Sequence, residues 1–157
     1  MTTEPVATIE DALLEHLRAA FDSLADSVRD LDPAGLDAIP GSETNSIAVL
    51  VVHTIETARS ILHEVVGEPL PRDRDAEFKV AGLSGDDLLE RLTEWSTEMD
   101  ELVRRALAEP LEREIRRYRV ATSAWWLLQV LGHTREHAAH AALTRQLLAD
   151  RTPSSPS

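Results

Sequence analysis

Three histidines stand close together near the end of the chain, and their spacing suits metal coordination. His133, His137 and His140 lie in one short segment with helical periodicity. At about 100° per residue, all three point along one ridge of a helix, at or beside its apolar stripe. Imidazoles at positions i and i+4 are close enough to bind a single metal ion. The ridge therefore predicts a ligand pair, His133 and His137.

A third ligand is expected from a facing helix, because two ligands do not make a site. His53 is the candidate, since it shares a helical face with the apolar residues Leu50 and Ile61. Three neutral imidazoles with an open fourth position are typical of a catalytic zinc site. Zinc or nickel suits such nitrogen ligands best, with iron and copper as alternatives. The competing interpretation is that these histidines are hydrogen-bonded core residues.

Other residues near this group have more than one interpretation. His140 is a candidate hydrogen-bond partner of a ligand, or a base in the pocket. Glu56 follows His53 by three residues and is a candidate base or ligand partner, with a solvated glutamate as the simpler alternative. Of the adjacent Trp125 and Trp126, at least one is expected in the core; Trp126 lies near the histidine ridge and is our pocket candidate.

A basic stretch precedes the last helix, and it too has two interpretations. It consists of Arg113, Arg116, Arg117 and Arg119. Such a cluster in an acidic protein can guide an anionic thiol or substrate. The alternative is an ordinary solvated linker.

Glycine and proline divide the chain into four long amphipathic segments with helical periodicity. The helices are expected from about Val6 to Asp30, from Asn45 or Ser46 to Gly67, from Ser84 to before Pro110, and from Thr122 or Ser123 to Asp150. Residues 68–83 are predicted to be a loop, and strand signals are nearly absent. The prediction is an all-α fold, an antiparallel four-helix bundle with long connections, which also permit a crossover in place of simple up-down-up-down order. It is a single domain over residues 1–150, with a disordered tail at 151–157.

Composition restricts the function further. The net charge of −12 argues against nucleic acid as the main partner. Because the chain has no cysteine, disulfides and cysteine nucleophiles are excluded, and any thiol must come from outside. The longest purely apolar run, residues 47–52, is far too short for a membrane span, and the first residues lack a signal pattern. We expect a cytoplasmic protein that acts on a small molecule, without a membrane partner.

These residues resemble the DinB-like superfamily of bacterial four-helix metalloproteins, which includes the YfiT-like proteins. That family has one histidine in an N-S-I-x-x-L-x-x-H type segment, matched here by residues 45–53, and two more as H-x-x-x-H, matched by His133 and His137. The resemblance covers about residues 8–149. Two departures mark a divergent branch: Gln129 stands where many members have a further histidine, and Ala138-Ala139-His140 replaces an Arg-Gly-Gln stretch.

The resemblance implies a divalent metal, zinc or nickel, held by His53, His133 and His137, with Gln129 beside the site. It also implies a homodimer, and a thiol transferase or isomerase that uses a small thiol such as bacillithiol or mycothiol, or else a hydrolase. Three functions stay open. They are a metal-dependent enzyme, a stress-related metal-binding bundle without turnover, and a helical interaction module whose histidines are core residues.

Overall fold

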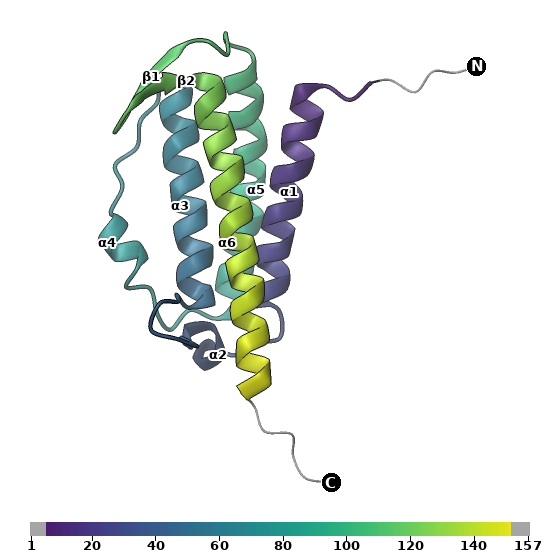
Figure 1. Cartoon of the computed structure of the whole chain (residues 1–157), viewed down its shortest axis with the longest axis vertical. Helices are drawn as coiled ribbons and strands as arrows, with labels where there is room; N and C mark the ends of the chain where they lie inside the picture. The colour runs from purple at the N-terminus through teal and green to yellow at the C-terminus, as the bar shows by residue number, and fades with distance from the viewer. Residues whose placement is uncertain (1–5, 152–157) are drawn as a thin grey trace, which may run out of the picture.

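The computed structural model describes residues 6–151, and four long helices dominate it (Figure 1). In chain order the elements are α1 (Ile9–Val28), α2 (Pro33–Asp37), α3 (Ile47–Val65), α4 (Arg74–Glu77), α5 (Gly85–Leu107), β1 (Glu114–Arg116), β2 (Val120–Thr122) and α6 (Ser123–Arg151). The long helices α1, α3, α5 and α6 form the bundle. The predicted all-α fold is therefore confirmed.

The bundle contains a crossover. Helix α5 runs antiparallel to α1, since Arg104 near its end pairs with Glu10 near the start of α1. Helix α3 runs antiparallel to α6 but parallel to α5, and α1 and α6 are parallel (Figure 1). The long connection between α3 and α5 makes this order possible, because it returns the chain to the end where α3 began.

The long helices begin where the sequence supplies capping side chains. Thr8, Ser46 and Ser84 each accept a hydrogen bond from the backbone N–H three residues further on. Asp11 and Asp87 return a bond to the cap residue and complete two capping boxes. Helix α1 consequently begins at Ile9, three residues later than its periodicity suggests.

Helix α3 is the most buried of the four long helices. It packs against both α5 and α6, and the connection from residue 66 to 84 covers part of its remaining surface (Figure 1). Its buried side chains run without a break from Ile47 to Ile55. His53 therefore lies inside the bundle, whereas a helix with one buried stripe would allow it to face solvent.

Two short elements contradict the predicted loop and the absence of strands. Helix α4 lies inside the segment predicted as a loop, and Asp73 caps it. Strands β1 and β2 form an antiparallel hairpin in which Ile115 pairs with Ala121 and is buried against the core. Strands of three residues are too short to produce a recognisable alternation, and so the periodicity misses them.

The basic stretch holds this hairpin in place. Arg113 donates a hydrogen bond to the backbone oxygen of Val65. Arg117 donates to the backbone oxygen of Ser60, at 3.1 Å, and to its hydroxyl, at 2.9 Å. Ser60 is about 10 Å further along α3 than His53, at 1.5 Å per residue. These two arginines therefore anchor the hairpin to the end of α3.

The predicted disordered tail, residues 151–157, lies almost entirely outside the described residues. Arg151 is the last residue of α6, and residues 152–157 of the predicted tail lie outside the described part of the chain. Between residues 6 and 151, no helix combines the length and the apolar character that crossing a bilayer requires.

Candidate metal centre

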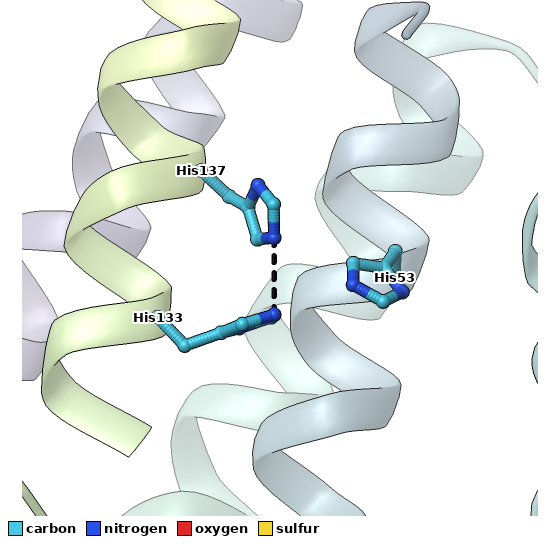
Figure 2. A group of neighbouring side chains, drawn as sticks. All are labelled: His53, His133 and His137. Carbon is cyan, nitrogen blue, oxygen red and sulfur yellow. Dashed lines mark hydrogen bonds between the residues drawn. The ribbon is translucent and has the colours of Figure 1, made fainter. Parts of the chain in front are cut away.

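The structure brings His53 of α3 together with His133 and His137 of α6 (Figure 2). The Nε2 atoms of His133 and His137 are 3.0 Å apart. The ring centroid of His53 is 5.1 Å from that of each of the other two. One nitrogen from each ring lies within 4.8 Å of the others, so a single ion can contact all three.

Two antiparallel helices position these side chains. Helix α6 buries Val130, Thr134 and Ala138. His133 and His137 follow each other by one turn beside this stripe and are half-buried. His53, only 7% exposed, meets them from α3. The ligand set thus rests on the packing of two helix interiors, which makes a rigid scaffold.

Burial keeps these imidazoles neutral. Desolvation is the main cause that lowers the pKa of all three histidines. The pKa of His133 falls to about 3, with repulsion from His137 and His53 as further causes. The pKa of His137 falls to about 4. Neutral rings offer the lone pairs that a metal ion needs, so the group is prepared for coordination at neutral pH.

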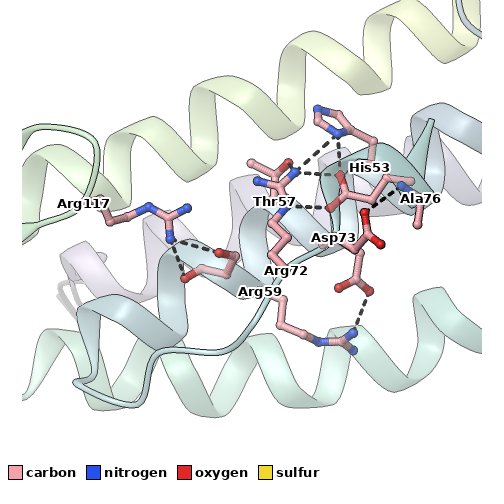
Figure 3. Close-up of polar contacts among 10 residues, drawn as sticks. His53, Thr57, Arg59, Arg72, Asp73, Ala76 and Arg117 are labelled. Carbon is pink, nitrogen blue, oxygen red and sulfur yellow. Dashed lines mark hydrogen bonds and ion pairs between the residues drawn. The ribbon is translucent and has the colours of Figure 1, made fainter.

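His53 has polar partners that the sequence analysis missed (Figure 3). Its Nδ1 lies 2.8 Å from Oε2 of Glu77, a residue only 4% exposed. Arg72 contacts the same carboxylate, and the Phe78 ring lies against His53 with centroids 4.7 Å apart. All three partners come from the predicted loop. Its alternating acidic and basic residues are typical of a solvated segment, so the sequence carries no signal that Glu77 is buried.

The other predicted residues lie at varying distances from the three histidines. His140 is exposed, but its ring centroid is 5.7 Å from that of His137. Gln129 is half-buried, one turn before His133 on α6. Glu56 forms an ion pair with Arg59 and lines a pocket beside α5, away from the histidines.

Trp126 packs in the core and does not line a pocket mouth. Its side chain is fully buried, with its ring centroid 4.8 Å from that of Trp125 and 5.1 Å from that of Tyr118. Its position on the buried stripe of α6 explains this placement, because the adjacent Trp125 takes the less buried side of the helix.

The fold and the site define a class: a four-helix bundle with three histidines gathered between its second and fourth long helices. The model of the DinB superfamily matches residues 13–141. The chain belongs to this superfamily. No curated protein gives a significant match.

Solved structures share the fold at low sequence identity. A conserved protein from Enterococcus faecalis is 15% identical, with a TM-score of 0.62, and the match covers 93% of this chain and 100% of that one. A protein assigned to the DinB family from Exiguobacterium sibiricum 255-15 is 18% identical, with a TM-score of 0.63, over 96% of this chain and 99% of that one. At these identities the likeness establishes the fold alone.

Proposed function

We propose that this protein binds one divalent metal ion, zinc or nickel, through His53, His133 and His137, and that the ion activates a small-molecule nucleophile. The observation that carries the proposal is the convergence of three neutral ring nitrogens within 4.8 Å, supplied by two packed helices. Three protein ligands leave a coordination position for a thiol or water. A bound metal lowers the pKa of either group and produces a nucleophile near neutral pH.

A pocket that His137 lines is the proposed route of a substrate to this position. Its volume is about 360 Å³, and its lining combines apolar side chains with polar ones: Leu50, Leu143, Leu147, Thr44, Asn45, Thr144, Glu43 and His140. Pockets of this size hold small molecules. His140, exposed at the rim, is placed to accept the proton that an incoming thiol or water loses. This access favours turnover over sequestration of the metal.

The charges of the pocket favour one kind of thiol. Its lining includes Glu43 but no lysine or arginine among the described residues. Two of the arginines that seemed suited to an anionic thiol, Arg113 and Arg117, instead hold the hairpin at the other end of α3. A thiol without carboxylates, such as mycothiol, therefore fits this pocket better than bacillithiol, which carries them.

The proposed reaction is the transfer of this thiol to an electrophilic carbon. A metal ion held by His53, His133 and His137 would lower the pKa of the thiol. The thiolate sulfur attacks the carbon, a carbon–sulfur bond forms, and the leaving group departs with its electron pair. The thiol proton passes to His140 and then to solvent. Because the chain has no cysteine, the sulfur belongs to the small molecule in every case.

The test uses untagged protein loaded with zinc or nickel. Mixed with a neutral thiol and monochlorobimane, it should form the fluorescent conjugate at least tenfold faster than the thiol alone, and the His133→Ala variant should not. A parallel reaction with p-nitrophenyl acetate tests hydrolysis. Stoichiometric metal with no acceleration of either reaction would contradict an enzymatic role and leave a metal-binding bundle.

We also propose that the protein forms a homodimer through an apolar face of α1 and α6. This face carries Ile9 and Leu128, which are 66% and 65% exposed, around an apolar groove of about 330 Å³. Exposed apolar side chains beside an apolar groove are typical of protein interfaces. Light scattering should give twice the chain mass of 17.4 kDa for the wild type.

The variant Leu128→Glu should shift this protein toward the monomer, because it places a charge in the apolar interface. Leu70→Glu is the matched control, since Leu70 is also exposed but does not line the groove. A wild type that stays at 17.4 kDa at high concentration would refute the dimer.

A further inference from the structure

The segment between α3 and α5 places an ion pair of half-buried Arg72 and buried Glu77 behind His53 (Figure 3). Arg72 donates from Nε to Oε1 of Glu77 at 2.6 Å, and from Nη2 to Oε2 at 2.7 Å. The same Nη2 group donates to the hydroxyl of Thr57 at 2.7 Å. Bidentate pairing of this kind fixes both position and plane of a carboxylate. Glu77 therefore presents Oε2 to His53 in one orientation.

This geometry determines which nitrogen of His53 carries a proton. Oε2 of Glu77 already accepts from Arg72, and a carboxylate oxygen can only accept a further bond. At 2.8 Å, an unprotonated Nδ1 would set two acceptors against each other. The alternative donor to Nδ1, Nη2 of Arg72, is more distant at 3.5 Å. Nδ1 is thus the donor, and a neutral His53 keeps its lone pair on Nε2.

We propose that Glu77 is a positioning residue for His53, held in place by Arg72. It fixes the Nδ1–H tautomer and the angle of the ring, so that Nε2 faces His133 and His137. This inference rests on the proposed function, because it gives Nε2 a metal to bind. A carboxylate behind a ligating histidine also raises the basicity of that ligand, and its loss typically weakens metal binding 10–100-fold.

The three histidines differ in whether their Nδ1 atom has a hydrogen-bond partner. Nδ1 of His133 and Nδ1 of His137 are buried, and neither has a hydrogen-bond partner within residues 6–151. The Phe78 ring adds a further restraint on His53 alone. His53 is consequently the one of the three whose ring is oriented through Nδ1 by a carboxylate, while the rings of His133 and His137 contact each other through their Nε2 atoms.

The chain contains a matched control for this network. On the α5 side of α3, His63 Nε2 lies 2.8 Å from Oε1 of Glu98, and Arg59 donates to Oε2 of the same carboxylate at 3.0 Å. This is again a histidine, a glutamate and an arginine, but none of the three belongs to the candidate metal centre. Glu98→Gln disrupts the same chemistry without touching His53.

The test compares Glu77→Gln with Glu98→Gln by two measurements. Nitrogen-15 NMR of the metal-free proteins at pH 7 reports which ring nitrogen of His53 is protonated. Competition with a chromophoric chelator reports the zinc affinity. We expect protonated Nδ1 in the wild type and in Glu98→Gln, and loss of this single tautomer in Glu77→Gln. The zinc affinity should fall about 10–100-fold in Glu77→Gln and remain within twofold in Glu98→Gln.

A second variant covers the case in which Glu77→Gln does not fold. The double variant Arg72→Met/Glu77→Met removes both charges together and leaves no buried charge unpaired, so that the fold is retained. It should show the same loss of the Nδ1–H tautomer. If both variants keep the wild-type tautomer and affinity, the inference is overturned. A tautomer that changes in a protein whose wild type binds no zinc would support the positioning role and overturn the proposed metal centre.

Discussion

Replacing His53, His133 or His137 by alanine will remove tight metal binding. Each variant leaves two of three nitrogen ligands, and two imidazoles alone hold zinc weakly. The loss should exceed the ~100-fold effect of removing an outer partner such as Glu77. Metal content by plasma emission spectrometry after gel filtration should fall from one ion per chain to a trace. Circular dichroism should show that the helices persist, because the apolar core does not include the metal.

Two other histidines provide controls for this experiment. His140 lies one turn beyond the pair on α6, and its removal should weaken metal binding far less. His63 contacts Glu98 and should have no effect. If the three ligand variants retain stoichiometric metal, the assignment of the ligands is wrong. If His140→Ala alone releases the metal, the ion lies further along α6.

Zinc affinity will fall only modestly from pH 7 down to about pH 5. With an ordinary histidine pKa near 6.5, each imidazole would cost a factor of about 30 at pH 5, or ~10⁴ for three ligands. Burial changes this expectation. The pKa of His133 is lowered to about 3 and that of His137 to about 4, so both rings stay neutral at pH 5. The pKa of His53 is lowered as well. The total loss should therefore be less than the factor of about 30 that one ordinary imidazole would cost.

A chelator competition at half-unit pH steps measures this directly. An affinity that falls steeply from pH 6.5, with a slope approaching three protons per metal, would show that the histidines are solvated in the metal-free protein. That result would contradict the packed arrangement of α3 and α6.

The same pKa shifts predict the acid stability of the metal-free fold. Below pH 6.5 the unfolded chain binds protons at these histidines, whereas the folded chain does not. The unfolding free energy therefore decreases as pH falls from about 6.5 toward the folded pKa values of about 4 and 3. Urea midpoints of the wild type should depend on pH more steeply in this window than those of a His133→Ala/His137→Ala variant.

The sequence predicts the long helices well, because their signals are local. The capping residues Ser46 and Ser84 mark two helix starts directly. The long connections permit a crossover, but its presence could not be decided from the sequence, since helix direction depends on which faces pack together. The hairpin was not predicted because each strand has only three residues. Its attachment to α3 relies on arginine contacts between residues distant in sequence.

For the candidate site, the histidines were predictable and their surroundings were not. His133 and His137 share a ridge by helical geometry alone, and His53 follows from its place on an apolar face. Glu77 is a charged residue in a polar segment, and only the return of the chain across α3 buries it. Trp126 was predicted to line a pocket but packs in the core. Its position next to the histidine ridge does not distinguish these two placements.

The proposed function depends on one metal ion held by His53, His133 and His137 between α3 and α6. Anomalous diffraction at the zinc absorption edge, from crystals of untagged protein purified with zinc, tests it most directly. We predict a single strong peak about 2.0–2.1 Å from one ring nitrogen of each histidine, with Nε2 as the ligand atom of His53. A zinc-replete crystal with no peak there, and with the three rings packed as in Figure 2, would contradict the proposed metal centre. It would identify the histidines as core residues.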